Sequence, residues 1–357
     1  SRYSLRHHKL RALRRDILYR RAFLRWHMDV IKINKPVYIA GTAAIVGKRE
    51  HEGPLGADFD MHDDSEKFGM DTWEKAESEM QRRALTLALA NAGMGGKSPD
   101  AVFAGDLMNQ CTSSAYGLMD FQAPYFGLYG ACSTFAESLM LSALMVNAGY
   151  FNACAAVTSS HFCTAERQFR FPLEYGGQRT PTAQRTATAS GAAVVSSDSA
   201  SDIKISEVLP GRIIDKGITD INNMGAAMAP AAIDTLTRYF SDTGSSPDDF
   251  DMILTGDLGR EGHGIVCDIM LSEGKDLRSV YNDCGLLLYN IESQDMHAGG
   301  SGCGCSAAVI AGHIMKRMRA GELHNVLYLA TGALMSPGSV FQGLSIPAIA
   351  HLVHFTA

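Results

Sequence analysis

The strongest constraint on the fold is that the two halves of the sequence repeat one design. In the first half, a short apolar run at 101–104 ends in Gly-Asp-Leu at 105–107. In the second half, a similar run at 251–255 ends in Gly-Asp-Leu at 256–258, which is 151 positions later. A short apolar run that ends in glycine and a polar residue is typical of a buried strand followed by a loop. The repeat predicts two copies of one structural unit.

A second pair of matching segments tests this idea. Ala-Cys-Ser at 131–133 opens a helix of small residues, and Gly-Cys-Ser at 304–306 opens another one 173 positions after the first. At the same offset, the apolar strand at 154–158 corresponds to the strand at 326–331. The second half has therefore gained 22 residues between its Gly-Asp-Leu strand and its Cys-Ser helix.

The order of strand and helix signals predicts the fold class. Residues 71–92 read as a helix, with Asp71 as its cap, Glu74 three positions later and Gly93 at its end. Strands that alternate with such helices indicate mostly parallel sheets, which is an α/β fold. The small-residue helices suit burial between two sheets. We predict a duplicated αβαβα five-layer sandwich, with an N-terminal half at 29–202 and a C-terminal half at 203–357.

Charge is distributed unevenly over the 357 residues. The whole chain has a formal charge of −6, but residues 1–27 hold nine Lys or Arg and one acid, so the remaining residues carry −14. An acidic body argues against binding to duplex nucleic acid, which needs clustered cations. The basic segment 1–28 is either a cationic helix for anionic lipid or sequence upstream of a start at Met28. We favour the second and exclude it from the fold.

Cysteine usage and hydropathy exclude several further classes. Eight cysteines in a long chain without an apolar secretory core indicate reduced thiols. Cys303-x-Cys305 and His161-x-Cys163 lack the spacing of an ordinary zinc site, so we predict no metal site and no cofactor. No apolar run is long enough to span a bilayer, because Glu137 and Asn147 interrupt the best candidate.

Cys132 is the first candidate for chemistry. It follows a strand-like run at 126–129 and Gly130, and it opens a helix. A thiol at the N-terminus of a helix has a lowered pKa and forms the nucleophilic thiolate more readily. The alternative is a small buried side chain without a chemical role.

These residues resemble a known superfamily. The cysteine elbow at 130–134 and the glycine cluster at 299–304, within duplicated α/β halves, are similar to thiolases and ketoacyl synthases. Residues 158–161 and 164–178 are more specific, because they resemble one family within this superfamily. Further matching segments lie at 39–43, 53–56, 212–215, 224–230 and 282–285. Over about residues 30–355, the sequence resembles the stage V sporulation protein AD (SpoVAD) family.

This resemblance implies a role in spore formation. Members bind dipicolinic acid (pyridine-2,6-dicarboxylic acid), as the calcium chelate or the free dianion, for uptake into the developing spore. They act as soluble proteins, peripherally associated with the forespore or spore inner membrane beside membrane-embedded SpoVA partners. The superfamily also implies a homodimer. A scaffold that only organises the membrane partners remains a further possibility.

The sequence also bears on thiolase chemistry. Acyl transfer needs a nucleophile, a general base and donors for the oxyanion. Cys132 supplies the nucleophile, but the stretch expected to carry a catalytic histidine, at 282–285, contains none. His297 occupies the later acid/base position. We predict an incomplete catalytic set and a pocket kept for ligand binding; the alternative is an active thiolase or ketoacyl synthase that uses Cys132 and His297.

A planar dicarboxylate suits guanidinium groups, which bind carboxylates with two parallel hydrogen bonds. Arg167 and Arg170 are the first candidates and Arg179 is a third. The alternative is a solvated or interface charge run in which Glu166 and Glu174 pair with these arginines. The other predicted ligand-binding residues are Cys132, His161, His297 and Ser301. Phe169 or Tyr175 would contact the aromatic ring of the ligand.

Overall fold

The computed structural model describes residues 30–169 and 179–357. The strands of the first half are β1 (Ile31–Lys32), β2 (Tyr38–Gly47), β3 (Met61–Asp63), β4 (Ala101–Gly105), β5 (Tyr125–Gly127), β6 (Ala153–Ser160), β7 (Arg185–Thr186) and β8 (Ala189–Ser196). Those of the second half are β9 (Lys204–Leu209), β10 (Met252–Thr255), β11 (Tyr281–Asp283), β12 (Gly300–Ser301), β13 (Asn325–Ala333) and β14 (Ala348–Thr356). The basic segment 1–28 lies outside the described residues.

Helices alternate with these strands. They are α2 (Lys48–His51), α3 (Trp73–Asn91), α4 (Thr112–Leu118), α5 (Thr134–Ala148), α6 (Phe162–Phe169), α7 (Met224–Thr243), α8 (Gly259–Ser272), α9 (Cys284–Leu287), α10 (Cys303–Ala308), α11 (Met315–Arg319) and α12 (Pro337–Phe341). A turn of 3₁₀ helix, Ala131–Ser133, precedes α5. A π-helical stretch, Val309–Ile314, joins α10 to α11.

Two groups of five strands repeat one topology. Their orders are β5-β4-β6-β8-β2 and β11-β10-β13-β14-β9. In each group the first three strands are parallel, and each of the next two is antiparallel to the strand before it. The groups meet where β2 pairs with β9 through Tyr38 and Lys204, so the hydrogen-bonded path is continuous. The duplicated α/β fold predicted from the repeat is confirmed.

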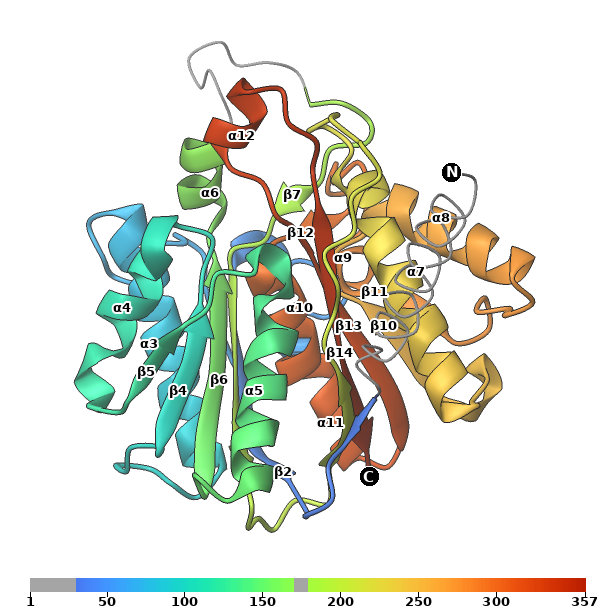
Figure 1. The fold of residues 1–357 in the computed structure, drawn as a ribbon. Helices are drawn as coiled ribbons and strands as arrows, with labels where there is room; N and C mark the ends of the chain where they lie inside the picture. Colours follow the sequence, from blue (N-terminus) through green and yellow to red (C-terminus); the bar gives the residue numbers. More distant parts are fainter. Residues whose placement is uncertain (1–29, 170–178) are drawn as a thin grey trace, which may run out of the picture.

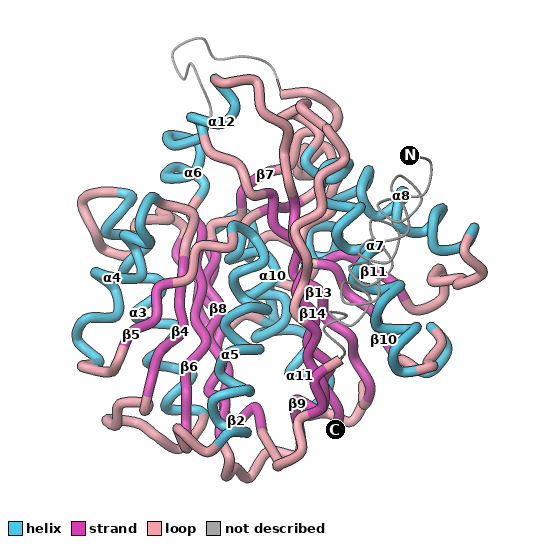
Figure 2. Tube along the Cα trace, in the orientation of Figure 1, coloured by secondary structure: helices cyan, strands magenta, loops and turns pink. Residues whose placement is uncertain are grey.

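The helices form layers between and outside the two strand groups (Figures 1 and 2). On one outer face, α3 packs on the first group through Met80 and Leu85. On the opposite outer face, α7 and α8 pack on the second group through Leu236 and Val266. Between the groups lie α5 and the helix that begins with α10. The sequence of layers is therefore helix, sheet, helix, sheet, helix.

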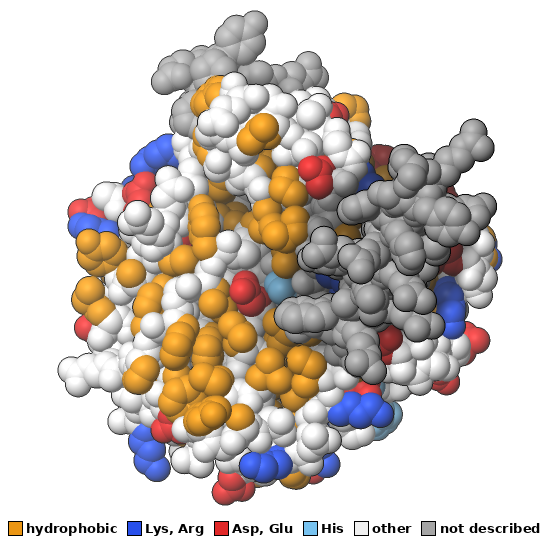
Figure 3. Space-filling view, in the orientation of Figure 1, with side chains coloured by type: hydrophobic (Ala, Val, Ile, Leu, Met, Phe, Trp, Pro, Cys, Tyr) orange, Lys and Arg blue, Asp and Glu red, His pale blue; other side chains and the backbone are white. Residues whose placement is uncertain are grey.

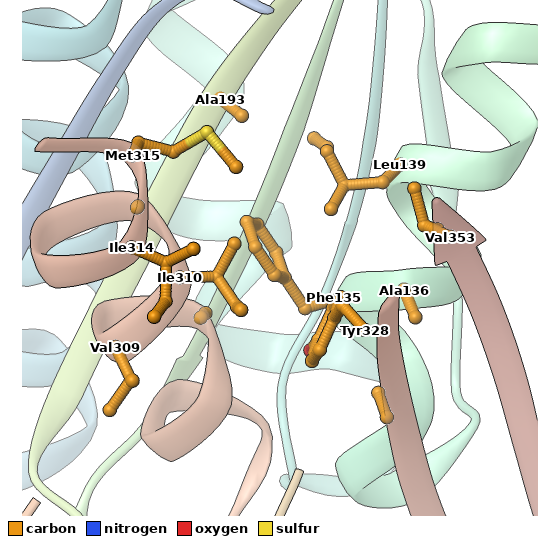
Figure 4. Packing of buried hydrophobic residues seen from close by; sticks show 14 of the residues in the cluster. Phe135, Ala136, Leu139, Ala193, Val309, Ile310, Ile314, Met315, Tyr328 and Val353 are labelled. Carbon is orange, nitrogen blue, oxygen red and sulfur yellow. The ribbon is translucent and has the colours of Figure 1, made fainter. Parts of the chain in front are cut away.

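The central helical layer belongs to both halves. Figure 4 shows Phe135 of α5 close to Ile310 of the π-helical stretch and to Tyr328 of β13, and Leu139 of α5 beside Val353 of β14. The rings of Phe135 and Tyr328 have centroids 6.3 Å apart. Burying an aromatic or leucine side chain contributes roughly 1.5–3 kcal/mol. The two halves are held together by one shared core.

Glycines allow α10 to lie directly on β8. A Cβ atom at Gly191 of β8 would lie 2.3 Å from the carbonyl carbon and oxygen of Ala307. A Cβ atom at Gly304 of α10 would lie 2.1 Å from the carbonyl oxygen of Ala189. Real Cβ atoms do not approach backbone this closely, so only glycine permits this contact. The central layer depends on these two positions.

The described residues include one stretch that is long and apolar enough to cross a membrane, Ala131–Ala148. It consists of α5 and the turn before it. In the fold this stretch lies in the central layer, where Phe135, Ala136, Leu139 and Ala143 are buried. Its apolar composition is therefore accounted for by the core.

The predicted helix at 71–92 is present, but its cap differs by one residue. Thr72 is the N-cap, and its hydroxyl accepts a hydrogen bond from the Lys75 amide at 3.3 Å. The Asp71 carboxylate instead accepts from the Lys75 ammonium group at 2.9 Å. The helix ends at Asn91, and Gly93 follows with a φ of +70°. Both side chains are of types that favour helix starts, so the sequence alone did not decide between them.

Candidate functional site

A cavity of about 650 Å³ opens near the carboxyl ends of β4, β6 and β13. Its wall is built from the start of α5, one face of α6, the segments 179–186, 221–228 and 333–339, and Ser301. These elements cluster in the upper part of Figure 1, around α6, β7, β12 and α12. Ligands of open α/β sheets bind at the carboxyl ends of strands. Both halves of the chain contribute to this cavity.

Cys132 lies in the cavity wall, at the turn before α5. The preceding residue, Ala131, has a φ of +51°, which is the left-handed region. The Cys132 Sγ atom lies 3.9 Å from the hydroxyl of Ser301, which comes from the second half. The Ser301 hydroxyl in turn donates to Asp257 Oδ2 at 2.9 Å. Two predicted residues, Cys132 and Ser301, are thus brought together beside a carboxylate.

The surroundings of Cys132 disfavour the thiolate form of its side chain. Burial raises the pKa of the Cys132 thiol well above its usual value, and the charge of Asp257 raises it further. Burial also raises the pKa of Asp257 to about 6. The helix N-terminus led us to expect a lowered thiol pKa; that expectation is wrong, because desolvation and a neighbouring anion both favour the neutral thiol. Cys132 is a protonated thiol at neutral pH.

Asp257 is the carboxylate beside Cys132 and Ser301 that the sequence reasoning did not single out. It is fully buried after β10, and its other oxygen, Oδ1, accepts from the Thr331 hydroxyl at 3.1 Å. Its backbone position is repeated by Asp106, which follows β4. The signal was present in the Gly-Asp-Leu repeat, because an aspartate directly after a buried parallel strand lies where sheets bind ligands.

The segment 282–285 does not face Cys132 in the way the superfamily resemblance implied. Asp283 is buried and accepts hydrogen bonds from the Thr255 hydroxyl at 2.7 Å and the Leu258 amide at 2.8 Å. These contacts fix the loop that carries Asp257. The segment therefore supports the acidic residue of the site, and the group beside Cys132 is Asp257.

His161 does not line the cavity. Its side chain is buried, and its Nε2 atom lies 2.9 Å from the Glu66 carbonyl oxygen. Its Nδ1 atom accepts from the Cys163 amide at 3.1 Å. Burial lowers the pKa of His161. Both ring nitrogens are used to hold the start of α6.

Arg167, one of the two arginines that were the first candidates, lies away from the cavity. It belongs to α6, where its guanidinium pairs with Glu74 at 2.5 Å on the outside of the molecule. More than half of its side chain is exposed, and it does not line the cavity. Arg170 and Tyr175 lie outside the described residues. The expected ligand role of Arg167 has no support from its position.

Arg179 and Phe169 are the predicted residues that do line the cavity besides Cys132 and Ser301. Arg179 NH2 lies 2.6 Å from Asp295 Oδ2, and NH1 donates to the Asp295 carbonyl oxygen at 3.0 Å. About 29% of its side chain is exposed. Among the cavity-lining residues that the structure describes, it is the single Lys or Arg.

His297 faces a second, smaller hollow of about 220 Å³ together with Arg260, Glu292 and Asp295. Its Nδ1 atom lies 2.6 Å from the Thr180 carbonyl oxygen, and Nε2 lies 3.1 Å from Asp295 Oδ1. It is therefore on the outer side of the segment that carries Arg179. The expected direct contact with a ligand is not supported by this placement.

A buried acidic network anchors α6 behind the cavity. The Thr164 hydroxyl of α6 donates to Glu77 Oε2 of α3 at 2.6 Å, and the Ser159 hydroxyl donates to Glu77 Oε1 at 3.0 Å. Burial and the nearby Asp106 raise the pKa of Glu77 to about 8. This shift favours the neutral form of Glu77, which lowers the cost of burying the group. The cavity wall formed by α6 is therefore fixed to α3.

Comparison with solved structures places the fold. The cerulenin-bound OleA of Xanthomonas campestris superimposes with a TM-score of 0.57 at 14% identity, covering 93% of this chain and 98% of OleA. The 3-oxoacyl-[acyl-carrier-protein] synthase III of Aquifex aeolicus VF5 gives a TM-score of 0.54 at 13% identity, covering 89% and 99%. The chain has the thiolase-like fold of these condensing enzymes.

Comparison with known sequences is more specific about the family than the comparison of folds. The profile of the stage V sporulation protein AD (SpoVAD) family matches residues 28–356. Stage V sporulation protein AD of Bacillus subtilis (strain 168) is 44% identical over 322 residues, which cover 90% of this chain and 94% of the relative. With the duplicated thiolase-like fold, these matches show that the chain is a sporulation protein and belongs to the stage V sporulation protein AD family.

Proposed function

We propose that the 650 Å³ cavity binds dipicolinate, the dianion of pyridine-2,6-dicarboxylic acid, during spore formation. The volume is within the range of small-molecule sites, roughly 300–1,000 Å³. Apolar side chains of Phe169, Met224 and Met228 offer a wall for an aromatic ring, and Thr180, Thr182 and Asn222 offer polar groups. An aromatic dicarboxylate needs both kinds of surface.

The observation that carries this proposal is Arg179 in the cavity wall. A guanidinium binds a carboxylate through charge-assisted hydrogen bonds, which are about twice as strong as neutral ones. Asp295 holds one side of this guanidinium, and the ligand would engage the side that faces the cavity. The Glu166 carboxylate also lines the cavity.

Acyl transfer is a second possible function of the same cavity, and it is less well supported. The raised pKa of Cys132 disfavours the nucleophile, and no histidine is among the described residues that line the cavity. In the proposed role, the protein captures dipicolinate at the spore inner membrane as a peripheral component and passes it to SpoVA membrane proteins. The exposed side chains of Ile221 and Leu344, near the cavity-lining segments, are compatible with such a partner.

Isothermal titration calorimetry tests the ligand directly. Dipicolinate, with and without calcium, should give saturable one-site binding at about micromolar or weaker affinity. Pyridine-2-carboxylate should bind about tenfold more weakly, because it lacks the second carboxylate and its hydrogen bonds. No heat with dipicolinate in either condition would overturn the proposal and favour a scaffold. An acyl adduct on Cys132 after incubation with acyl-CoA would favour the enzyme.

We further propose that the protein is a homodimer formed through β5. The first strand group ends at β5, where Tyr125 and Phe126 are exposed to about 40%. Figure 3 shows apolar side chains gathered over the region where Figure 1 draws α5 and β5. An edge strand without charges invites pairing with another strand. A second copy, related by a two-fold axis, would present the same strand in return.

Light scattering checks the dimer. The intact chain should have twice the mass of one chain, and Phe126→Asp should shift it toward one chain by placing a charge at the contact. Ile269→Asp is the matched control, because Ile269 on α8 is 38% exposed against 40% for Phe126. A monomeric wild-type protein, or equal behaviour of both variants, would refute this interface.

A further inference from the structure

The segment 179–184 forms one wall of the cavity and is held from behind by the segment 295–300. Arg179, Thr180, Thr182, Ala183 and Gln184 all line the cavity. The Ala298 amide donates to the Ala183 carbonyl oxygen at 3.1 Å, and Gln184 Nε2 donates to the Gly300 carbonyl oxygen at 2.8 Å. The position of this wall therefore depends on residues that do not touch the cavity.

Two of these outer residues form a closed ring of polar contacts with Arg179. Arg179 NH2 contacts Asp295 Oδ2 at 2.6 Å. Asp295 Oδ1 lies 3.1 Å from His297 Nε2. His297 Nδ1 lies 2.6 Å from the carbonyl oxygen of Thr180, the residue after Arg179. The ring thus returns to the segment from which it starts.

The backbone of the outer segment is adapted to this ring. Asp295 and His297 have φ angles of +55° and +54°. Non-glycine residues adopt this left-handed region infrequently and at a cost in conformational energy. The cost is offset by the contacts that each side chain makes in the ring.

From this geometry we propose that His297 is a positioning residue for Arg179, and that its protonation strengthens the binding of a dicarboxylate in the cavity. The inference rests on the proposed dipicolinate function. Nδ1 of His297 donates to Thr180 and fixes the wall. When Nε2 is also protonated, it donates to Asp295, so that the ring carries a net positive charge instead of none. Arg179 then acts on the ligand with its charge less compensated.

Other ionisable groups surround this ring and require a control. Arg260 and Glu292 face the small hollow with His297 and pair with each other at 2.8 Å. Asp257, which accepts a hydrogen bond from Ser301 in the cavity wall, is a further titratable group, because burial raises its pKa to about 6. A pH profile of the wild type alone would not distinguish these groups. An asparagine at 297 places its amide nitrogen near the position of Nδ1, so it can donate to Thr180 but cannot become charged, and it isolates the histidine.

The test is dipicolinate titration of the intact chain at about pH 5.5 and about pH 8, which bracket the usual titration of histidine. Wild-type affinity should rise about fivefold at the lower pH. His297→Asn should bind like the wild type at pH 8 and lose this rise. His297→Ala should bind about five- to tenfold more weakly than the wild type at pH 8, because the hydrogen bond to Thr180 is lost.

The outcomes separate this inference from the function on which it rests. Wild-type binding with the same pH profile in His297→Asn would overturn the proton linkage while dipicolinate binding stands. Wild-type affinity in His297→Ala would overturn the positioning role. If His297→Ala does not fold, as a thermal melt would show, His297→Asn still decides the linkage. No wild-type binding would overturn the function and this inference together.

Discussion

Gly191→Ala should destabilise the protein by about 3 kcal/mol or more. The added methyl group would lie 2.3 Å from backbone atoms of Ala307, and a backbone cannot move aside as a flexible side chain can. Overpacking of a core costs about 1–3 kcal/mol for extra methylenes and more where rigid elements must separate. Here the elements are β8 and α10, which belong to different halves. The free energy of unfolding in urea measures the effect.

The matched control is Gly264→Ala, the same substitution in a helix. Gly264 lies inside α8, and nothing stands within 4 Å of its added Cβ. Alanine is favoured over glycine in helices by about 1 kcal/mol, so this variant should be stabilised by about 0.5–1 kcal/mol. Equal stability of the two variants would contradict the close approach of α10 to β8.

Arg179→Gln should weaken dipicolinate binding by about 10- to 100-fold. The substitution removes the charge that the described cavity wall presents to a carboxylate, and hydrogen bonds to charged groups contribute about 1.5–3 kcal/mol. Glutamine retains a polar group of similar reach, so the loss reports the guanidinium itself. Calorimetric titration of both proteins at one pH gives the ratio of dissociation constants.

Arg260→Gln is the control for this prediction. Arg260 pairs with Glu292 at 2.8 Å, as Arg179 pairs with Asp295, but it lines only the smaller hollow. Its removal should change the dissociation constant by less than about twofold, since exposed ion pairs contribute little. If both variants lose affinity equally, general charge and not the cavity arginine would account for binding.

The duplication was predictable because it depends only on spacing along the chain. The spacing between the Cys-Ser helix and the strand after it is the same in the two halves, and both groups have the same strand order. Cys132 and Ser301 were also predicted as neighbours of one ligand, and their side chains lie 3.9 Å apart. Local signals, a helix start and a glycine cluster, led to both residues, and their proximity is what the structure shows.

The choice among the candidate arginines was not predictable in the same way, as Arg167 shows. Ala165 and Phe169 are four residues apart on α6 and both line the cavity. A residue two positions after Ala165 points to the opposite side of a helix, and Arg167 accordingly contacts Glu74. The rotation of α6 about its axis follows from its packing on α3, which periodicity in so short a helix does not reveal.

The thiol of Cys132 illustrates a second limit. The helix N-terminus, a local feature, would lower its pKa, whereas burial and Asp257 raise it. Asp257 is 125 positions away in the sequence and belongs to the other half. Interactions between the halves, which no single segment contains, therefore decide the chemistry of this site.

The unit that is repeated along the sequence is smaller than the unit that folds, because both halves share the central helical layer. Each half has its own five-stranded group and outer helices. Yet α5 and α10 bury their side chains in one cluster drawn from both halves. Either half alone would expose that surface to water. A half expressed alone would need the other half, or a second copy of itself, to cover this surface.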